Sequence, residues 1–288
     1  MKPPGMTSHD VVARVRRLTK IKRTGHGGTL DPLAEGVLPM ALGQACRLID
    51  FLPSDKTYYA EILLGKQTTT DDLEGEVINE KDASHITAEQ IEAVLPHFVG
   101  TIKQHPPVYS AIRINGKHLY DLARQGQAPE KAPERTVVVH ELDVVFVKPP
   151  VFAIRVHCGK GTYIRSLARD MGEMLGTGGV LQKLVREKAG NLHISKSLTL
   201  ENLQEHIGKA DWQSLFTDLA DALGFCKVDV ADSDADNIFN GRIVELPHQE
   251  KSQYLLAVQN GSYIGLLKHT QENHFKPEVV FSDARVST

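Results

Sequence analysis

One carboxylate in this sequence, Asp31, follows a glycine-rich turn and precedes a proline, in the segment GHGGTLDPLAEG at residues 25–36. Three glycines within four positions let the backbone pass close to a large ligand, because they carry no Cβ atoms. Pro32 keeps Asp31 extended or in a turn, so its carboxylate belongs to a loop and could attack a substrate or stabilise a positive charge. The residue types alone equally suit an Asx turn that only shapes the backbone.

A carboxylate that reacts in a dry pocket must stay ionised, which requires a nearby cation or hydrogen-bond donors. Arg165, in the segment CGKGTYIR at residues 158–165, is a candidate because a guanidinium is always charged and can grip a carboxylate through two bonds. A phosphate contact or a surface pair would suit Arg165 equally well. Tyr58 opens a predicted strand, and its hydroxyl could move a proton, although a core position is the commoner use.

Metal and nucleotide motifs are absent from the sequence. None of the 13 histidines falls in an H-E-x-x-H pattern, and no G-x-G-x-x-G follows a strand. The run Gly159-Lys160-Gly161-Thr162 is no phosphate loop, because Ile154 stands where that motif needs glycine. A carboxylate-based hydrolase would need a paired acid, and the nearest one, Glu35, lies in a different local setting. We therefore expect neither a metal nor another cofactor.

The composition describes a chain able to form one large domain and one small one, with 288 residues and a net charge of −3. Residues 1–50 hold eight Lys/Arg against four Asp/Glu, whereas residues 201–288 hold seven against fourteen. A basic face around the glycine turn would suit phosphate contacts. No apolar run reaches the roughly 20 residues of a membrane span, and three scattered cysteines suit the reducing cytoplasm. We expect a cytoplasmic protein without membrane contact.

The periodicity of the sequence predicts an α+β fold: a mixed, largely antiparallel central sheet flanked by helices, followed by a small β-rich module. A polar, turn-rich segment at about 104–133 is expected to be a functional loop. We predict a large domain over 1–223 and the β-rich domain over 224–288. Helices are predicted from Ser8 (as N-cap), over 37–52, 87–99, 117–124 and 162–175, and strands over 58–64, 75–78, 136–147, 152–158, 225–230, 254–258, 263–267 and 278–281.

Five motifs, in order over about residues 1–200, closely resemble those of the bacterial tRNA pseudouridine-55 synthases, the TruB family. They are KPPGMTSHD at 2–10, GHGGTLDPLA at 25–34, PPVYSA at 106–111, GKHLY at 116–120 and GKGTYIR at 159–165. Gly27, Thr69 and Val185 depart from the residues usual in that family. The acidic carboxy-terminal segment resembles, in length and texture, the PUA module often appended to these enzymes.

The resemblance implies the pseudouridine synthase fold and isomerisation of uridine to pseudouridine at position 55, in the T-arm of tRNA, without a cofactor. It assigns catalysis to Asp31, Tyr58 and Arg165. It also implies that the target base is flipped out of the RNA and that His26 fills the vacated space. Attack on the base, attack on the sugar and charge stabilisation all remain open for Asp31. The expected substrate and RNA contacts are Lys2, His26, Asp72, Tyr109, Arg113, Lys117, Leu184 and Arg186.

The resemblance also implies an enzyme that acts on tRNA as a monomer, without an obligate protein partner. Two other interpretations stay open. A guide-dependent synthase would work inside a ribonucleoprotein, although the chain lacks basic low-complexity tails. A non-catalytic RNA-binding or folding protein would bind RNA but would not need Asp31.

Overall fold

The computed structural model describes residues 1–114, 116–129, 131–209, 212–246 and 253–281. The chain divides into two compact units, both of which the polypeptide enters more than once. Unit 1 comprises Met1–Ser8, Leu30–Leu38 and Ser54–Thr199, and unit 2 comprises His9–Thr29, Pro39–Pro53 and Leu200–Thr288. The predicted boundary after residue 223 stays a prediction.

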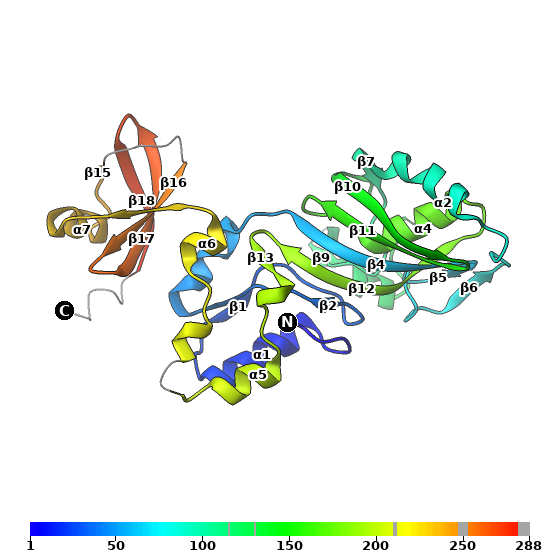
Figure 1. Ribbon diagram of the computed structural model, residues 1–288, viewed down its shortest axis with the longest axis horizontal. Helices are drawn as coiled ribbons and strands as arrows, with labels where there is room; N and C mark the ends of the chain where they lie inside the picture. The colour runs from blue at the N-terminus through cyan, green and yellow to red at the C-terminus, as the bar shows by residue number, and fades with distance from the viewer. Residues whose placement is uncertain (115, 130, 210–211, 247–252, 282–288) are drawn as a thin grey trace. The chain divides into compact units, whose positions relative to one another are not determined.

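A seven-stranded sheet forms the frame of unit 1, with the order β13-β12-β4-β11-β10-β7 and β2 beside β12 (Figure 1). All neighbours in that order are antiparallel, while β2 and β12 are parallel. The sheet is thus mixed and largely antiparallel, as predicted. Its strands are β2 (Glu35–Gly36), β4 (Lys56–Leu64), β7 (Gly100–Gln104), β10 (Arg135–Lys148), β11 (Val151–Cys158), β12 (Gly179–Ala189) and β13 (Leu192–His193).

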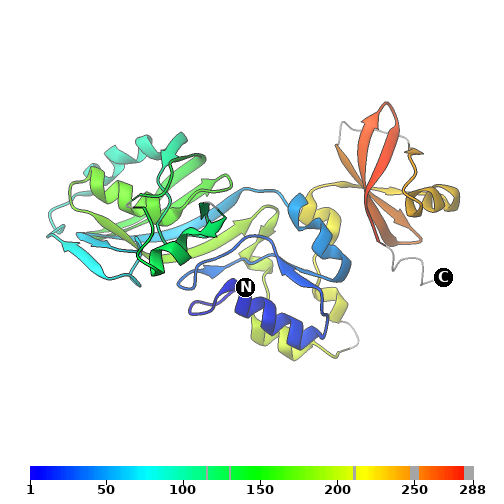
Figure 2. The same cartoon turned by 180° about the vertical axis from the view of Figure 1, so that it is seen from behind.

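Alternation of side chains along β4 gives the sheet one buried and one open face. Tyr58, Ala60, Ile62 and Leu64 are buried, and the residues between them are half-buried. Helix α4 (Ile164–Met174) packs on β4 and β12, and Leu167 and Met171 from this helix are fully buried. The sheet faces the viewer in Figure 1, and Figure 2 shows the same unit from behind with α4 in front of it.

The remaining elements of unit 1 match most of the predicted pattern. Thr87 forms a capping box with Gln90 at the start of α2, and the helix passes into a 3₁₀ turn that contains Pro96. The predicted functional loop holds a short hairpin and a helix, which carry a small core of Ile112, Leu119 and Ala132. These elements are β5 (Lys66–Thr68), β6 (Val77–Glu80), α2 (Ala88–Val94), η2 (Leu95–Phe98), β8 (Arg113–Ile114), β9 (Lys117–His118), α3 (Leu119–Arg124) and η3 (Ile194–Lys196).

Unit 2 holds the β-rich carboxy-terminal sheet, with the order β14-β16-β17-β18-β15, together with helices from both ends of the chain. One of its cores joins Leu48 to Leu223 and Leu256. The predicted helix over 37–52 is wrong in part: β3 pairs with β1, and Gly43, with φ of +58°, begins a 3₁₀ helix. The elements are α1 (Ser8–Thr19), β1 (Thr24–His26), β3 (Met40–Leu42), η1 (Gly43–Phe51), α5 (Leu200–His206), η4 (Trp212–Leu215), α6 (Leu219–Leu223), β14 (Cys226–Asp229), α7 (Asp232–Phe239), β15 (Val244–Glu245), β16 (Tyr254–Gln259), β17 (Ser262–Gln271) and β18 (His274–Val280).

Gly36 sits where three backbone segments of unit 1 converge. It exchanges backbone hydrogen bonds of 2.8 and 3.0 Å with Lys2, and it pairs with Arg186 on the other side. Its φ is +116°, and an added Cβ would lie 2.3 Å from the Arg186 carbonyl oxygen. Both the conformation and the space therefore require glycine here.

We predict that Gly36→Ala lowers the free energy of unfolding by about 3 kcal/mol or more, because it combines a strained φ with a backbone clash. Gly159→Ala is the matched control, since the nearest atom to its new Cβ would be 3.6 Å away. The control should stay within about 1 kcal/mol of the unchanged chain. Urea unfolding measures both, and equal losses would contradict this account of Gly36.

Candidate active site

Asp31 lies on a loop of unit 1 that is held on both sides. The Ser8 hydroxyl donates to the Leu30 carbonyl (3.0 Å) and accepts from the Leu30 N–H (2.9 Å). Gly5 N–H and the Lys2 ammonium donate to the Pro32 carbonyl at 2.8 and 3.1 Å. The Asp31 side chain keeps 36% of its surface exposed. The carboxylate is thus open to solvent on a backbone that has little freedom.

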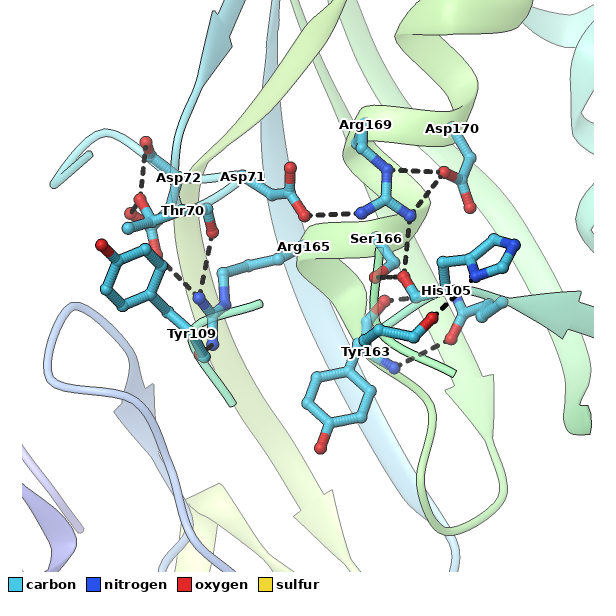
Figure 3. Close-up of polar contacts among 12 residues, drawn as sticks. Thr70, Asp71, Asp72, His105, Tyr109, Tyr163, Arg165, Ser166, Arg169 and Asp170 are labelled. Atoms are coloured by element: carbon cyan, nitrogen blue, oxygen red, sulfur yellow. Dashed lines mark hydrogen bonds and ion pairs between the residues drawn. The ribbon is translucent and has the colours of Figure 1, made fainter. Parts of the chain in front are cut away.

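Arg165, the second residue of α4, brings a buried guanidinium to this carboxylate. Its Nη2 lies 2.9 Å from an Asp31 carboxylate oxygen, and its Nη1 lies 3.4 Å from Asp72. Two backbone carbonyls, those of Thr70 and Tyr109, each accept from it at 3.0 Å (Figure 3). The side chain is only 7% exposed, so its charge is balanced mainly by the two carboxylates. The structure places the predicted partner of Asp31 beside it.

Asp72 is the buried one of the two carboxylates. The Thr70 hydroxyl donates to it, as does the Glu74 N–H at 3.0 Å. These bonds fix a tight turn, in which the preceding Asp71 has a φ of +62°. Asp72 therefore anchors Arg165 and leaves Asp31 as the exposed carboxylate of the pair.

Tyr58 points from β4 into the buried side of the sheet. Burial raises the pKa of Tyr58 to about 12, although the positive charge of Arg186 works in the opposite direction. The negative charge of Asp31 raises this pKa further. The phenol is consequently protonated at neutral pH and can donate a proton or a hydrogen bond.

Lys2 and Arg186 are fully buried, which differs from the exposed position that an RNA contact requires. The Lys2 ammonium donates to the carbonyls of Pro3, Met6 and Pro32, and burial lowers its pKa. Arg186 donates from Nε to the Val37 carbonyl at 2.7 Å. Both side chains hold the backbone around the Asp31 loop.

The remaining predicted substrate and RNA contacts lie in several parts of the structure. Leu184 is buried opposite Ala60 in the same core as Leu30 and Tyr58, and Tyr109 offers Arg165 its carbonyl. Arg113 and Lys117 are exposed on the hairpin of β8 and β9, where Arg113 meets His118 at 3.3 Å. His26 ends β1 in unit 2, and its closeness to Asp31 stays a prediction.

A second polar layer, not predicted from the sequence, lies behind Arg165. Arg169, one helical turn further along α4, pairs with Asp71 at 2.7 Å and with Asp170 at 2.8 Å, and it donates to the His105 carbonyl (Figure 3). Ser166 donates to the same carbonyl at 2.8 Å. The spacing of Arg165 and Arg169 places both on one face of the predicted helix over 162–175, which is the sequence signal for this second cation.

Among the residues that the structure describes, a group suited to a metal ion lies elsewhere in unit 1, at Asp55, His140 and His157. Within those same ranges, no helix has the length and apolar character to cross a membrane. At the Asp31 site, the carboxylate of Asp31, the guanidinium of Arg165 and the phenol of Tyr58 form a set that supports acid–base or nucleophilic chemistry on an organic substrate.

Comparison with known proteins identifies the class. Residues 16–164 match the family model "TruB family pseudouridylate synthase (N terminal domain)", and residues 165–224 match "tRNA pseudouridylate synthase B C-terminal domain". The tRNA pseudouridine synthase B of Gloeothece citriformis is 42% identical over 98% of this chain and 95% of its own, and that of Acaryochloris marina is 51% identical over 72% of each.

Solved structures agree on the fold. A Cbf5-Nop10-Gar1 complex contains a chain with a TM-score of 0.72 and 26% identity, covering 97% of this chain and 82% of that one. A chain of an H/ACA RNP bound to a substrate RNA containing 2'-deoxyuridine also has a TM-score of 0.72, at 24% identity and with 97% and 83% coverage.

The family models, the named relatives and the fold thus define a pseudouridine synthase, an isomerase. Within this class, the chain belongs to the TruB family. The predicted resemblance, the predicted fold class with its β-rich carboxy-terminal part, and the enzyme class of tRNA pseudouridine synthase are confirmed.

The Asp71 carboxyl gives the second polar layer a pH dependence. Burial raises its pKa to about 6, while Arg169 works against this shift. The folded chain holds the Asp71 proton more tightly than the unfolded chain does. Protonation of Asp71 therefore adds to the free energy of unfolding in full below about pH 4, and this contribution is lost as the pH rises through about 6.

We predict that Asp71→Asn removes this dependence. Relative to the variant, the unchanged chain should lose about 3 kcal/mol of unfolding free energy between pH 4 and neutrality. Asparagine tolerates the left-handed conformation at this position. Denaturant unfolding at several pH values measures the difference, with Asp143→Asn, at an exposed carboxylate of β10, as the control. Parallel pH profiles for all three proteins would contradict the prediction.

Proposed function

We propose that this chain isomerises uridine to pseudouridine at position 55 in the T-arm of tRNA, with Asp31 as the reacting carboxylate and without a cofactor. The observation that carries the proposal is the exposed Asp31 carboxylate 2.9 Å from a buried Arg165 guanidinium. The names of the relatives, tRNA pseudouridine synthase B, support tRNA as the substrate. Free cysteines at positions 46, 158 and 226 suit work in the cytoplasm.

The reaction breaks the bond between N1 and C1′, turns the uracil ring, and joins C5 to C1′. C5 loses a proton and N1 gains one, so no oxidant or activated group is consumed. Arg165 pairs with Asp31 and orients its carboxylate, whether the carboxylate attacks the base, attacks the sugar or stabilises the separated sugar cation. The protonated Tyr58 phenol is suited to stack on the base and to assist one of the proton transfers.

A uridine in a folded loop reaches such a site only after it leaves the base stack, which costs a few kcal/mol. In our proposal His26 fills the vacated space and Leu184 contacts the uracil ring. Tyr109 and the exposed Arg113 and Lys117 of the loop at about 104–133 contact the RNA stem–loop. Asp72 acts through Arg165, and the buried Lys2 and Arg186 act by positioning the Asp31 loop.

We further propose that the chain works as a monomer without a guide RNA, and that residues 224–288 form a PUA-like module that adds to RNA affinity. The solved relatives named as Cbf5 and H/ACA complexes make the guide-dependent alternative the one to test. An unmodified tRNA transcript incubated with the purified chain alone separates these possibilities: pseudouridine at position 55 supports the proposal, and its appearance only with added partners would support the alternative.

We predict that Asp31→Asn abolishes turnover of that transcript while tRNA affinity stays within about tenfold, because phosphate contacts supply most of the binding energy. The change preserves the shape of the side chain and removes the charge. Pseudouridine formation with tRNA in excess over the enzyme, and filter binding, measure the two effects. Multiple turnovers by the variant would overturn the role assigned to Asp31.

We predict that Arg165→Lys lowers kcat by about 10²- to 10³-fold, because one ammonium cannot serve two carboxylates and two carbonyls at once. Arg155→Lys is the matched control: Arg155 also grips a carboxylate with two bonds, to Glu187, but on the exposed side of the sheet. The control should stay within about fivefold of the unchanged enzyme. Similar losses for both variants would contradict a specific role for Arg165.

A further inference from the structure

Two histidines and an aspartate meet in unit 1 at the end of the sheet where β4 begins. Asp55 immediately precedes β4, His140 lies in β10 and His157 lies in β11. One ligand atom from each of the three side chains lies within 4.8 Å of the others. His140 Nε2 is 3.6 Å from an Asp55 carboxylate oxygen, and the two imidazole rings are 4.8 Å apart between centroids.

A β-bulge brings the two histidines together. Val139 pairs with Cys158, and Glu141 pairs with His157, so His140 is the extra residue of the longer strand. A bulge re-aims the side chain of the extra residue, and here the His140 ring faces that of His157 at 45°. The backbone of Asp55 is fixed as well, since its carbonyl accepts from the Gly190 N–H at 2.8 Å. The three ligands therefore come from backbone that is already ordered.

We propose that Asp55, His140 and His157 bind one divalent transition-metal ion of the zinc class. Imidazole nitrogens together with a carboxylate oxygen suit zinc, copper and nickel, whereas magnesium and calcium prefer oxygen ligands alone. Tetrahedral coordination at about 2.0–2.1 Å separates ligand atoms by about 3.4 Å. The most distant pair must therefore approach by at most about 1.4 Å, which rotation of half-exposed side chains can supply.

Two features set this group apart from a surface ion pair. An ion pair of His140 and Asp55 would involve only one imidazole. Here a second imidazole, that of His157, lies beside the His140 ring. The neighbouring cation, Lys56, donates to the Ser54 carbonyl at 2.6 Å, so its ammonium has a partner outside the group. Three protein ligands with a side open to water are the arrangement in which zinc keeps a further, exchangeable position. The bound ion would tie the start of β4 to β10 and β11, three residues before Tyr58.

The test is Zn²⁺ binding to the full chain at neutral pH, by calorimetry after removal of metals with a chelator. We expect one Zn²⁺ whose affinity falls at least tenfold in His140→Ala, His157→Ala and Asp55→Asn, because loss of a direct ligand exceeds the effect of a supporting one. Zn²⁺ should raise the melting temperature of the unchanged chain and not that of these variants.

His97→Ala is the matched control, since His97 is also an exposed histidine of unit 1 and should leave both readouts unchanged. Circular dichroism and melting temperature in the chelator establish that each variant folds, and the conservative Asp55→Asn keeps the test valid should a histidine variant fail to fold. Zn²⁺ binding of equal affinity and stoichiometry in the unchanged chain and the folded variants would overturn the proposal, as would no binding to the unchanged chain.

Discussion

Arg165 carries a positive charge inside unit 1, and two carboxylates of opposite character neutralise it. Asp72 is buried and anchored by hydrogen bonds, while Asp31 keeps a third of its side chain exposed. A buried guanidinium without such partners would be very costly, so the fold must bring the turn at residues 70–72 and the loop at residue 31 to the start of α4. The ion pair that the chemistry needs is thus also a structural constraint on three distant segments.

The surrounding residues make that constraint rigid. Lys2 and Ser8 hold the backbone on either side of Asp31, and Arg186 donates to the Val37 carbonyl. These groups are polar and buried, and each donates to a carbonyl or a side chain, which avoids the cost of an unsatisfied polar atom. An exposed reactive carboxylate thereby stands on a backbone that the protein interior positions.

The sequence predicts the structure best where local chemistry decides the outcome. The need of an ionised Asp31 for a cation pointed to Arg165, and alternation along residues 58–64 predicted β4. Prediction failed where distant segments decide: the 70–72 turn, which holds Arg165, has no local pattern that announces its partner. Ser8 resembled a helix cap, yet its hydroxyl bonds Leu30, and residues 37–52 carried helical spacing although Met40–Leu42 form a strand beside β1. Lys2 and Arg186 are expected from the resemblance to contact substrate or RNA, and only the structure shows that both are buried.

A crystal structure of this chain with an RNA stem–loop that carries the target uridine would show whether the Asp31 carboxylate meets the reacting nucleoside. We predict an everted uridine whose C1′ or ring carbon lies about 3–3.5 Å from an Asp31 carboxylate oxygen, with Arg165 still paired to that carboxylate. A uridine bound away from Asp31, or an Asp31 side chain turned from the nucleoside, would contradict it.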